Sequence, residues 1–200
     1  SEVTIKKFDK GWFFDGAGEE KALIFYPGAK VATEAYAPLM YQLAESGIDC
    51  FLVDMPFHMA FFGMNRAEEI MQEYNYEAWY LGGHSLGGAM AANFAADYVE
   101  DHTDGIRGLL LLAAYPTKDL STSDMSVVTV YGSEDGVLNM DKIVAGRELM
   151  PQDYKEVCIE GGNHAQFGSY GAQKGDGTAA IPAEEQWART VEVFVGDESE

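Results

Sequence analysis

Apolar and polar positions alternate along the chain in blocks that predict strands and helices in turn. Segments that contain runs of apolar or β-branched residues, typical of strands, occupy residues 22–28, 48–56, 78–85, 106–116, 125–136 and 154–164. Between them, apolar residues recur at helical spacing and predict helices over residues 33–47, 64–75, 86–100, 139–150 and 182–195. Strands buried on both faces read as unbroken apolar runs, so this alternation predicts an α/β fold, with a mostly parallel sheet covered by helices on both faces.

The remaining segments fit the same plan. Residues 1–16 are expected to form an edge hairpin, and no repeat, low-complexity tract or linker interrupts the chain. We therefore expect one domain over residues 1–200. Residues 165–181 are the only long irregular stretch, and two interpretations stay open: a functional loop or a surface excursion between strand and helix.

Charge and hydropathy exclude several classes of protein. The chain carries 13 basic and 33 acidic residues, a formal charge of −20, and this field repels nucleic acids and anionic lipid. We expect this negative charge to reflect a solvated acidic surface, and the alternative is that it steers cationic substrates toward the protein. No stretch of about 18 apolar residues predicts a transmembrane helix. The start lacks the apolar core of a signal peptide, which favours a soluble cytoplasmic protein; a secreted or anchored form whose N-terminal segment was removed stays open.

The cysteines do not form a framework. Cys50 and Cys158 fall on different predicted strands, and two cysteines are too few for a disulfide scaffold or a metal site. We expect both to be buried free thiols.

The most informative stretch is "WYLGGHSLGGAM" at residues 79–90, where an apolar run ends in glycines around a serine. No lysine follows the glycines, which excludes a phosphate-binding P-loop, and the spacing does not fit a dinucleotide fingerprint. Gly83 to Gly87 reads G-x-S-x-G between a strand and a helix, as a nucleophile elbow requires. Ser85 is therefore the candidate nucleophile.

From about residue 20 to 195 the chain resembles the α/β-hydrolase superfamily, and its small capless members near the dienelactone-hydrolase branch most of all. The resemblance implies a three-layer α/β-hydrolase fold and a fixed order of serine, acid and histidine, each following a strand. "YGSEDGV" then supplies Asp135 as the acid, with Glu134 as its competitor, and "GGNHAQFG" supplies His164 as the base. Asp54 is a weaker alternative acid because it precedes the serine.

Two backbone amides are expected to hold the oxyanion. Leu86 N–H opens the helix after the serine, and the second donor should come from the loop after residue 28. Many relatives carry His-Gly there, whereas Pro27 in this chain removes one donor. Ala29 is therefore the expected second donor, with Lys30 as the alternative.

Other candidates have structural alternatives. His84 is expected to play a structural role with its side chain away from Ser85, and His102 to lie at the surface. Residues 55–64 either line an apolar acyl pocket or pack a helix onto the sheet, and the pocket candidates there are Phe57, His58, Met59, Phe61 and Phe62.

These features predict a serine hydrolase that cleaves a small ester or similar acyl bond through an acyl-enzyme, without metal or organic cofactor. The alternatives are an acyltransferase with the same residues and a binding module without turnover. The serine puts dienelactone itself in doubt, because that branch often uses a cysteine. The sequence does not indicate an oligomeric state.

Overall fold

The computed structural model describes residues 2–56, 63–102 and 105–196. It contains the strands β1 (Thr4–Phe8), β2 (Gly11–Asp15), β3 (Lys21–Tyr26), β4 (Asp49–Val53), β5 (Ala78–His84), β6 (Ile106–Leu112), β7 (Ser126–Gly132) and β8 (Tyr154–Ile159). The helices are α1 (Ala37–Glu45), α2 (Arg66–Glu73), α3 (Leu86–Asp101), α4 (Met140–Gly146) and α5 (Ala183–Gly196). Short 3₁₀ turns are η1 (Thr33–Tyr36), η4 (Arg147–Leu149) and η5 (Ala165–Phe167). The alternating order predicted from the apolar runs is confirmed.

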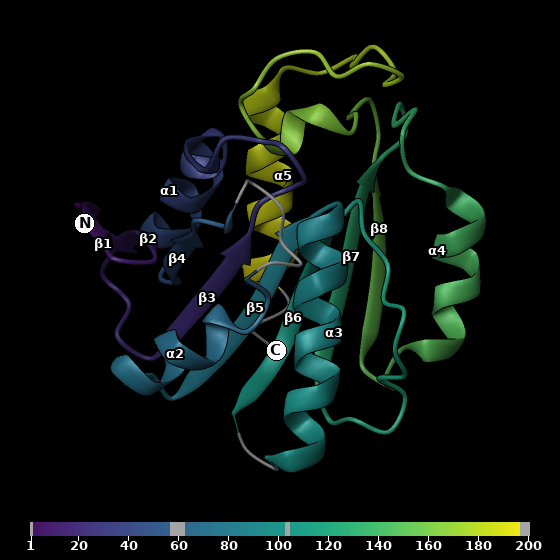
Figure 1. The fold of residues 1–200 in the computed structure, drawn as a ribbon. Helices are drawn as coiled ribbons and strands as arrows, with labels where there is room; N and C mark the ends of the chain where they lie inside the picture. The colour runs from purple at the N-terminus through teal and green to yellow at the C-terminus, as the bar shows by residue number, and fades with distance from the viewer. Residues whose placement is uncertain (1, 57–62, 103–104, 197–200) are drawn as a thin grey trace.

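All eight strands join one sheet in the order β1-β2-β4-β3-β5-β6-β7-β8 (Figure 1). β1 and β2 form the expected antiparallel hairpin, and β2 pairs antiparallel with β4. The remaining pairs are parallel. The carboxyl ends of these parallel strands therefore meet at one edge of the sheet, at the top of Figure 1.

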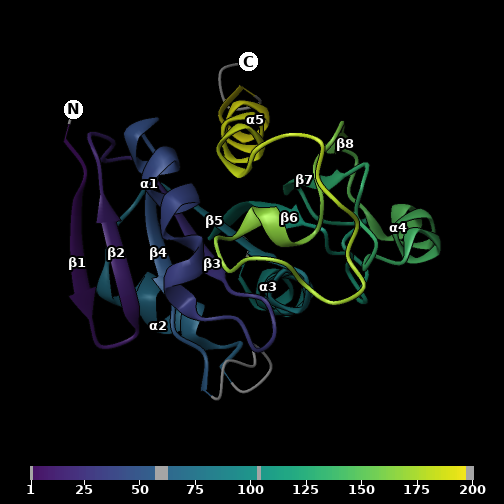
Figure 2. The ribbon, with the colours of Figure 1, turned by 90° about the horizontal axis from the view of Figure 1, so that it is seen from above.

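Side chains of successive strand residues point to opposite faces, which gives the sheet two apolar cores. Leu39 of α1 and Trp187 of α5 pack with one set of strand residues, and Ile70 of α2 and Ala92 of α3 pack with the other. Figure 2 shows α5 and α3 on opposite sides of β5 and β6. The three-layer α/β-hydrolase fold expected from the resemblance is confirmed.

Helix and strand ends differ from the expected ranges where local geometry changes. The helix expected over residues 139–150 is α-helical only to Gly146 and then continues as η4. The strand expected over residues 154–164 ends at Ile159, because Gly161 adopts a φ of 83° and turns the chain. Among the helices in the described part of the chain, none is long and apolar enough to cross a membrane.

The two cysteines differ in exposure. Both are free, as expected, and Cys50 on the central strand β4 is buried. Cys158 is exposed, so the expectation of two buried thiols is wrong. β8 is the last strand of the sheet and has a neighbour on one side only, which leaves the Cys158 side chain open to solvent.

We predict that a thiol reagent such as dithionitrobenzoate modifies Cys158 in the native protein and reaches Cys50 only after unfolding. Burial and the neighbouring Glu160 raise the pKa of the Cys158 thiol, so the reaction is best followed at about pH 9, where more of the reactive thiolate is present. A Cys158→Ser variant should show no reaction until denaturant is added. Rapid reaction of that variant in its native state would contradict the placement of Cys50.

Candidate active site

Ser85 lies at the sharp turn between β5 and α3. Its backbone has φ 56° and ψ −124°, a conformation that non-glycine residues rarely adopt and that costs on the order of 1–3 kcal/mol. Its amide donates to the Leu112 carbonyl of the neighbouring strand at 2.9 Å, which fixes the turn against the sheet. Ser85 itself is half-buried.

Glycines on both sides of Ser85 make this turn possible. A Cβ on Gly87 would lie 2.2 Å from the carbonyl oxygens of both Tyr26 and Pro27. A Cβ on Gly83 would lie 2.5 Å from the backbone of Gly87. The backbones of β3, β5 and α3 therefore touch directly, and only glycine fits at these positions.

Asp135 and His164 meet at the same edge of the sheet. Asp135 follows β7 by three residues, His164 follows β8, and His164 Nδ1 lies 2.8 Å from Asp135 Oδ2. The His164 and Asp135 side chains are only 2% and 3% exposed. The ring of His84, the residue before Ser85, lies 4.6 Å from the His164 ring between centroids, which places His164 beside the serine turn.

The other Asp135 oxygen is also occupied. Asp135 Oδ1 accepts hydrogen bonds from the Val137 and Leu138 amides, both at 2.8 Å. Burial opposes ionisation of Asp135, but the hydrogen bonds from His164 and these amides outweigh it and hold its pKa below the ordinary value. Asp135 is therefore an ionised, fixed acceptor for His164.

The two alternative acids lie elsewhere. Glu134 is exposed, and its carboxylate accepts from the neighbouring Ser133 hydroxyl at 3.4 Å. Asp54 forms an ion pair with Lys7 at 2.8 Å. Neither carboxylate has a hydrogen bond to His164 among the described residues.

His84 belongs to a buried polar chain. The Gly28 amide donates to the Tyr36 hydroxyl at 3.0 Å, and this hydroxyl lies 2.7 Å from His84 Nδ1. The Tyr36 oxygen already accepts from Gly28, so its proton is free to point at Nδ1. His84 is 1% exposed, and its Nε2 has no hydrogen-bond partner of good geometry within the described residues.

The loop after β3 offers two amides that could hold an oxyanion. Pro27 has no N–H and the Gly28 amide is taken by Tyr36, whereas neither Ala29 nor Lys30 makes a hydrogen bond through its amide among the described residues. Val31 N donates to the Gly28 carbonyl at 3.3 Å, which closes a turn around Ala29 with Lys30 at φ 60°. Across from it, Leu86 is the first residue of α3, and the first amides of a helix lack intrahelical acceptors.

Three residues of this site were not predicted from the sequence. They are Tyr36, Gln186 of α5, which is fully buried, and Asp176, which accepts hydrogen bonds from the His164 loop. A polar residue in an apolar helical stripe was the available signal for Gln186. The candidates Phe57, His58, Met59, Phe61 and Phe62 lie outside the described residues. His102 is exposed, as expected, and its ring stacks on that of Tyr98.

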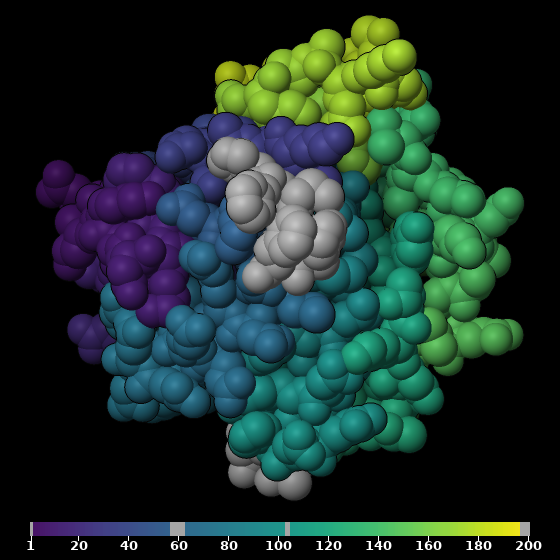
Figure 3. Space-filling model, viewed as in Figure 1, coloured from purple at the N-terminus to yellow at the C-terminus, as the bar shows by residue number. Residues whose placement is uncertain are grey.

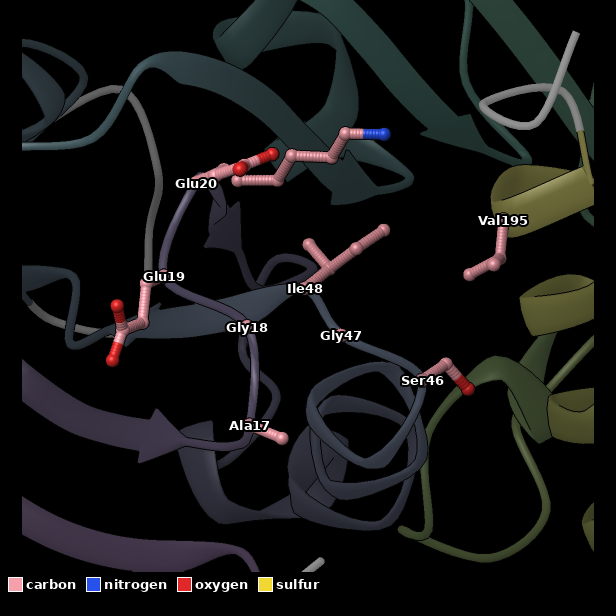
Figure 4. Close-up of a pocket in the computed structure, with 9 residues that line it drawn as sticks. Ala17, Gly18, Glu19, Glu20, Ser46, Gly47, Ile48 and Val195 are labelled. Carbon is pink, nitrogen blue, oxygen red and sulfur yellow. The ribbon is translucent and has the colours of Figure 1, made fainter.

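A separate hollow of about 450 Å³ lies at the amino ends of β3 and β4 (Figure 4). It is lined by the loop of residues 17–20, by the end of α1 and by Val195 of α5. This edge of the sheet is opposite to Ser85, so the hollow is not part of the site. Within the described residues, no group of three or more His, Cys, Asp or Glu side chains is arranged to hold a metal ion.

Solved structures share this architecture at low sequence identity. Est1E from Butyrivibrio proteoclasticus superposes with a TM-score of 0.68 at 15% identity, and the match covers 100% of both chains. A monoacylglycerol lipase from Paleococcus ferrophilus gives 0.68 at 14% identity, over 98% of this chain and 99% of that one. The esterase domain of a Rhodothermus marinus protein also gives 0.68 at 14% identity, over 98% and 97%. At such identities the likeness shows the fold alone.

No curated protein sequence matches the chain. The family model described as "Alpha/beta hydrolase family" matches residues 22–188, which is most of its length. The chain therefore belongs to the alpha/beta hydrolase family.

Proposed function

We propose that the protein is a serine hydrolase that cleaves a carboxylic ester, or a comparable acyl bond, through an acyl-enzyme on Ser85. The observation that carries the proposal is the buried pair of His164 and Asp135, held beside a serine whose backbone is strained. Strained backbone conformations persist where the surrounding structure forces them, and they cluster at functional sites.

The direction of the hydrogen bond between His164 and Asp135 defines the role of each residue in the proposed mechanism. Ionised Asp135 can only accept, so His164 carries its proton on Nδ1 and presents a lone pair on Nε2. In the proposed mechanism Nε2 removes the proton from Ser85 Oγ as the oxygen attacks the acyl carbon. The imidazolium then donates this proton to the leaving alcohol, and Asp135 stabilises the positive charge until it does.

The second half of the reaction uses the same groups. His164 takes a proton from water, the resulting hydroxide attacks the acyl-enzyme, and Ser85 recovers its proton as the acid leaves. In both halves the Leu86 and Ala29 amides are the proposed donors to the negative oxygen of the tetrahedral intermediate, each worth about 2.7–4 kcal/mol in measured cases.

An ester is the favoured substrate class. One structural neighbour is named as an esterase domain and another as a monoacylglycerol lipase, which supports an ester bond without identifying the acyl group. Likeness to the dienelactone-hydrolase branch remains part of the proposal, with serine in place of cysteine as nucleophile.

His84 supports the proposal by staying neutral. Burial, and then the neighbouring His164, lower the pKa of His84 to about 3, although Asp135 acts in the opposite direction. With Tyr36 donating to Nδ1, the proton of neutral His84 sits on Nε2. Of the two adjacent rings, only His164 is paired with a carboxylate and suited to carry a positive charge.

We predict that Ser85→Ala abolishes labelling by a fluorophosphonate probe and lowers hydrolysis of short p-nitrophenyl esters by at least about 10³-fold. Asp135→Asn should lower kcat by up to about 10⁴-fold, because the amide disturbs the tautomer and charge of His164. Ser121→Ala, an exposed serine in a distant turn, is the matched control and should behave as the original protein. Unchanged hydrolysis by Ser85→Ala would exclude the mechanism, and product analysis with an added alcohol separates hydrolysis from acyl transfer.

We predict that His84 makes the free energy of unfolding depend on pH. The pKa of His84 is about 3 in the native state against an ordinary value of 6.5, so the unfolded chain binds the proton and stability falls as pH drops below 6.5. The loss attributable to His84 should be about 2 kcal/mol between pH 6.5 and about pH 5.

Urea unfolding at a series of pH values measures this dependence. His84→Asn keeps an acceptor for Tyr36 but cannot be protonated, so this part of the pH slope should disappear. His102→Asn, at an exposed position, controls for the loss of one imidazole. Equal slopes in the original protein and His84→Asn would show that His84 is not held neutral by its surroundings.

A further inference from the structure

The irregular segment between η5 and α5 crosses the edge of the sheet where the site lies. It forms the yellow-green top of the molecule in Figures 1 and 3, above the carboxyl ends of the strands. The carboxylate of Asp176, in this segment, contacts the loop that carries His164.

Asp176 accepts hydrogen bonds from four backbone amides. Its Oδ1 accepts from His164 at 3.2 Å, from Gly136 at 3.1 Å and from Gly177 at 2.8 Å. Its Oδ2 accepts from Ala165 at 2.8 Å. Hydrogen bonds to an ionised acceptor are roughly twice as strong as neutral ones. One carboxylate therefore joins the loop that carries Asp135 to the loop that carries His164.

The glycines beside Asp176 bring it this close. A Cβ on Gly177 would lie 1.9 Å from the Glu134 carbonyl oxygen, and a Cβ on Gly136 would lie 2.5 Å from the Gly175 carbonyl oxygen. Gly175 itself has a φ of 87°. The segment around Asp176 is thus packed backbone to backbone against the Asp135 loop, and it does not hang free over the site.

The His164 loop is held from its other side by α5. Buried Gln186 accepts from the Asn163 amide at 3.2 Å and donates to the Asn163 carbonyl at 2.8 Å. The loops after β7 and β8 are also joined directly, because the Glu134 amide donates to the Gly162 carbonyl at 2.8 Å. These contacts position residues before His164, whereas Asp176 contacts His164 itself and the residue that follows Asp135.

We propose that Asp176 is a positioning residue that keeps His164 in register with Asp135 and Ser85. Among the described residues, its carboxylate accepts hydrogen bonds from backbone amides only and has none to the side chains of Ser85, Asp135 or His164. The proposal rests on the proposed function, in which the His164 ring must hold its place through two proton transfers. A displacement of about 1 Å at such a group can cost about 10²-fold in rate.

The test compares Asp176→Ala and Asp176→Asn with the original protein. Asp176→Ala removes all four acceptor contacts, and kcat for a p-nitrophenyl ester should fall by about 10- to 10²-fold while KM changes by less than about 3-fold. Asp176→Asn keeps one oxygen but replaces the other with a donor, so its loss should be smaller. Asp153→Asn, which removes one charge at the exposed start of β8, is the control and should leave kcat unchanged.

Two measurements separate positioning from simple destabilisation. Fluorophosphonate should finally label the same fraction of Asp176→Ala molecules as of the original protein. The rate of labelling should be reduced by about 10-fold or more. The imidazole Nδ1–H proton of His164, bound to Asp135, should give a downfield NMR signal in the original protein that broadens or vanishes in Asp176→Ala. Circular dichroism confirms that the compared samples are folded.

The proposal and the proposed function fail in different ways. Normal labelling of Ser85→Ala would reject the function, yet the NMR signal would still test the role of Asp176. An Asp176→Ala protein with unchanged kcat and an unchanged Nδ1–H signal would overturn the positioning role, as would activity that falls only with the unfolded fraction.

Discussion

The direct backbone contact at the start of α3 determines the geometry on which the rest of the site depends. With no side chain at Gly83 or Gly87, the first turn of α3 presses against the carbonyls of Tyr26 and Pro27 at the end of β3. Because of this contact, the backbone of Ser85 does not take the usual negative φ and instead has a φ of 56°. The same contact sets the Leu86 amide near the turn that follows β3. The turn at the candidate nucleophile and the place of the proposed oxyanion donor are thus consequences of one packing constraint.

Buried polar contacts fix Asp135 and His164, the proposed partners of Ser85. Asp135 can remain ionised in a nearly closed site because three hydrogen bonds offset the cost of burial. His84, in contrast, stays neutral, because burial lowers its pKa and the Tyr36 hydroxyl donates a hydrogen bond to its Nδ1. Because His84 stays neutral, the imidazolium that forms on His164 in the proposed mechanism has no like charge in the adjacent ring.

The apolar runs of the sequence were sufficient for the strands and helices, and the G-x-S-x-G motif for the turn at Ser85, because each depends on residues close together in the chain. The preference for Asp135 over Glu134 required the family resemblance, since both carboxylates follow the same strand. The exposure of Cys158 could not be read from its apolar run, because strand order decides which strand lies at the edge. Asp176 and Gln186 were not predicted, since their partners lie in irregular loops without periodicity.

The order of the segment that contains Asp176 has a different physical origin from the order of the sheet. Its ends are tied to distant parts of the fold by polar groups: the Ser169 amide donates to the Ala35 carbonyl at 2.7 Å, and Asp176 accepts from the loops after β7 and β8. The entropic cost of closing a loop grows only slowly with its length, so a few charge-assisted hydrogen bonds can offset it. The candidate site therefore combines groups positioned by the ends of the strands with one segment positioned by hydrogen bonds to a single carboxylate.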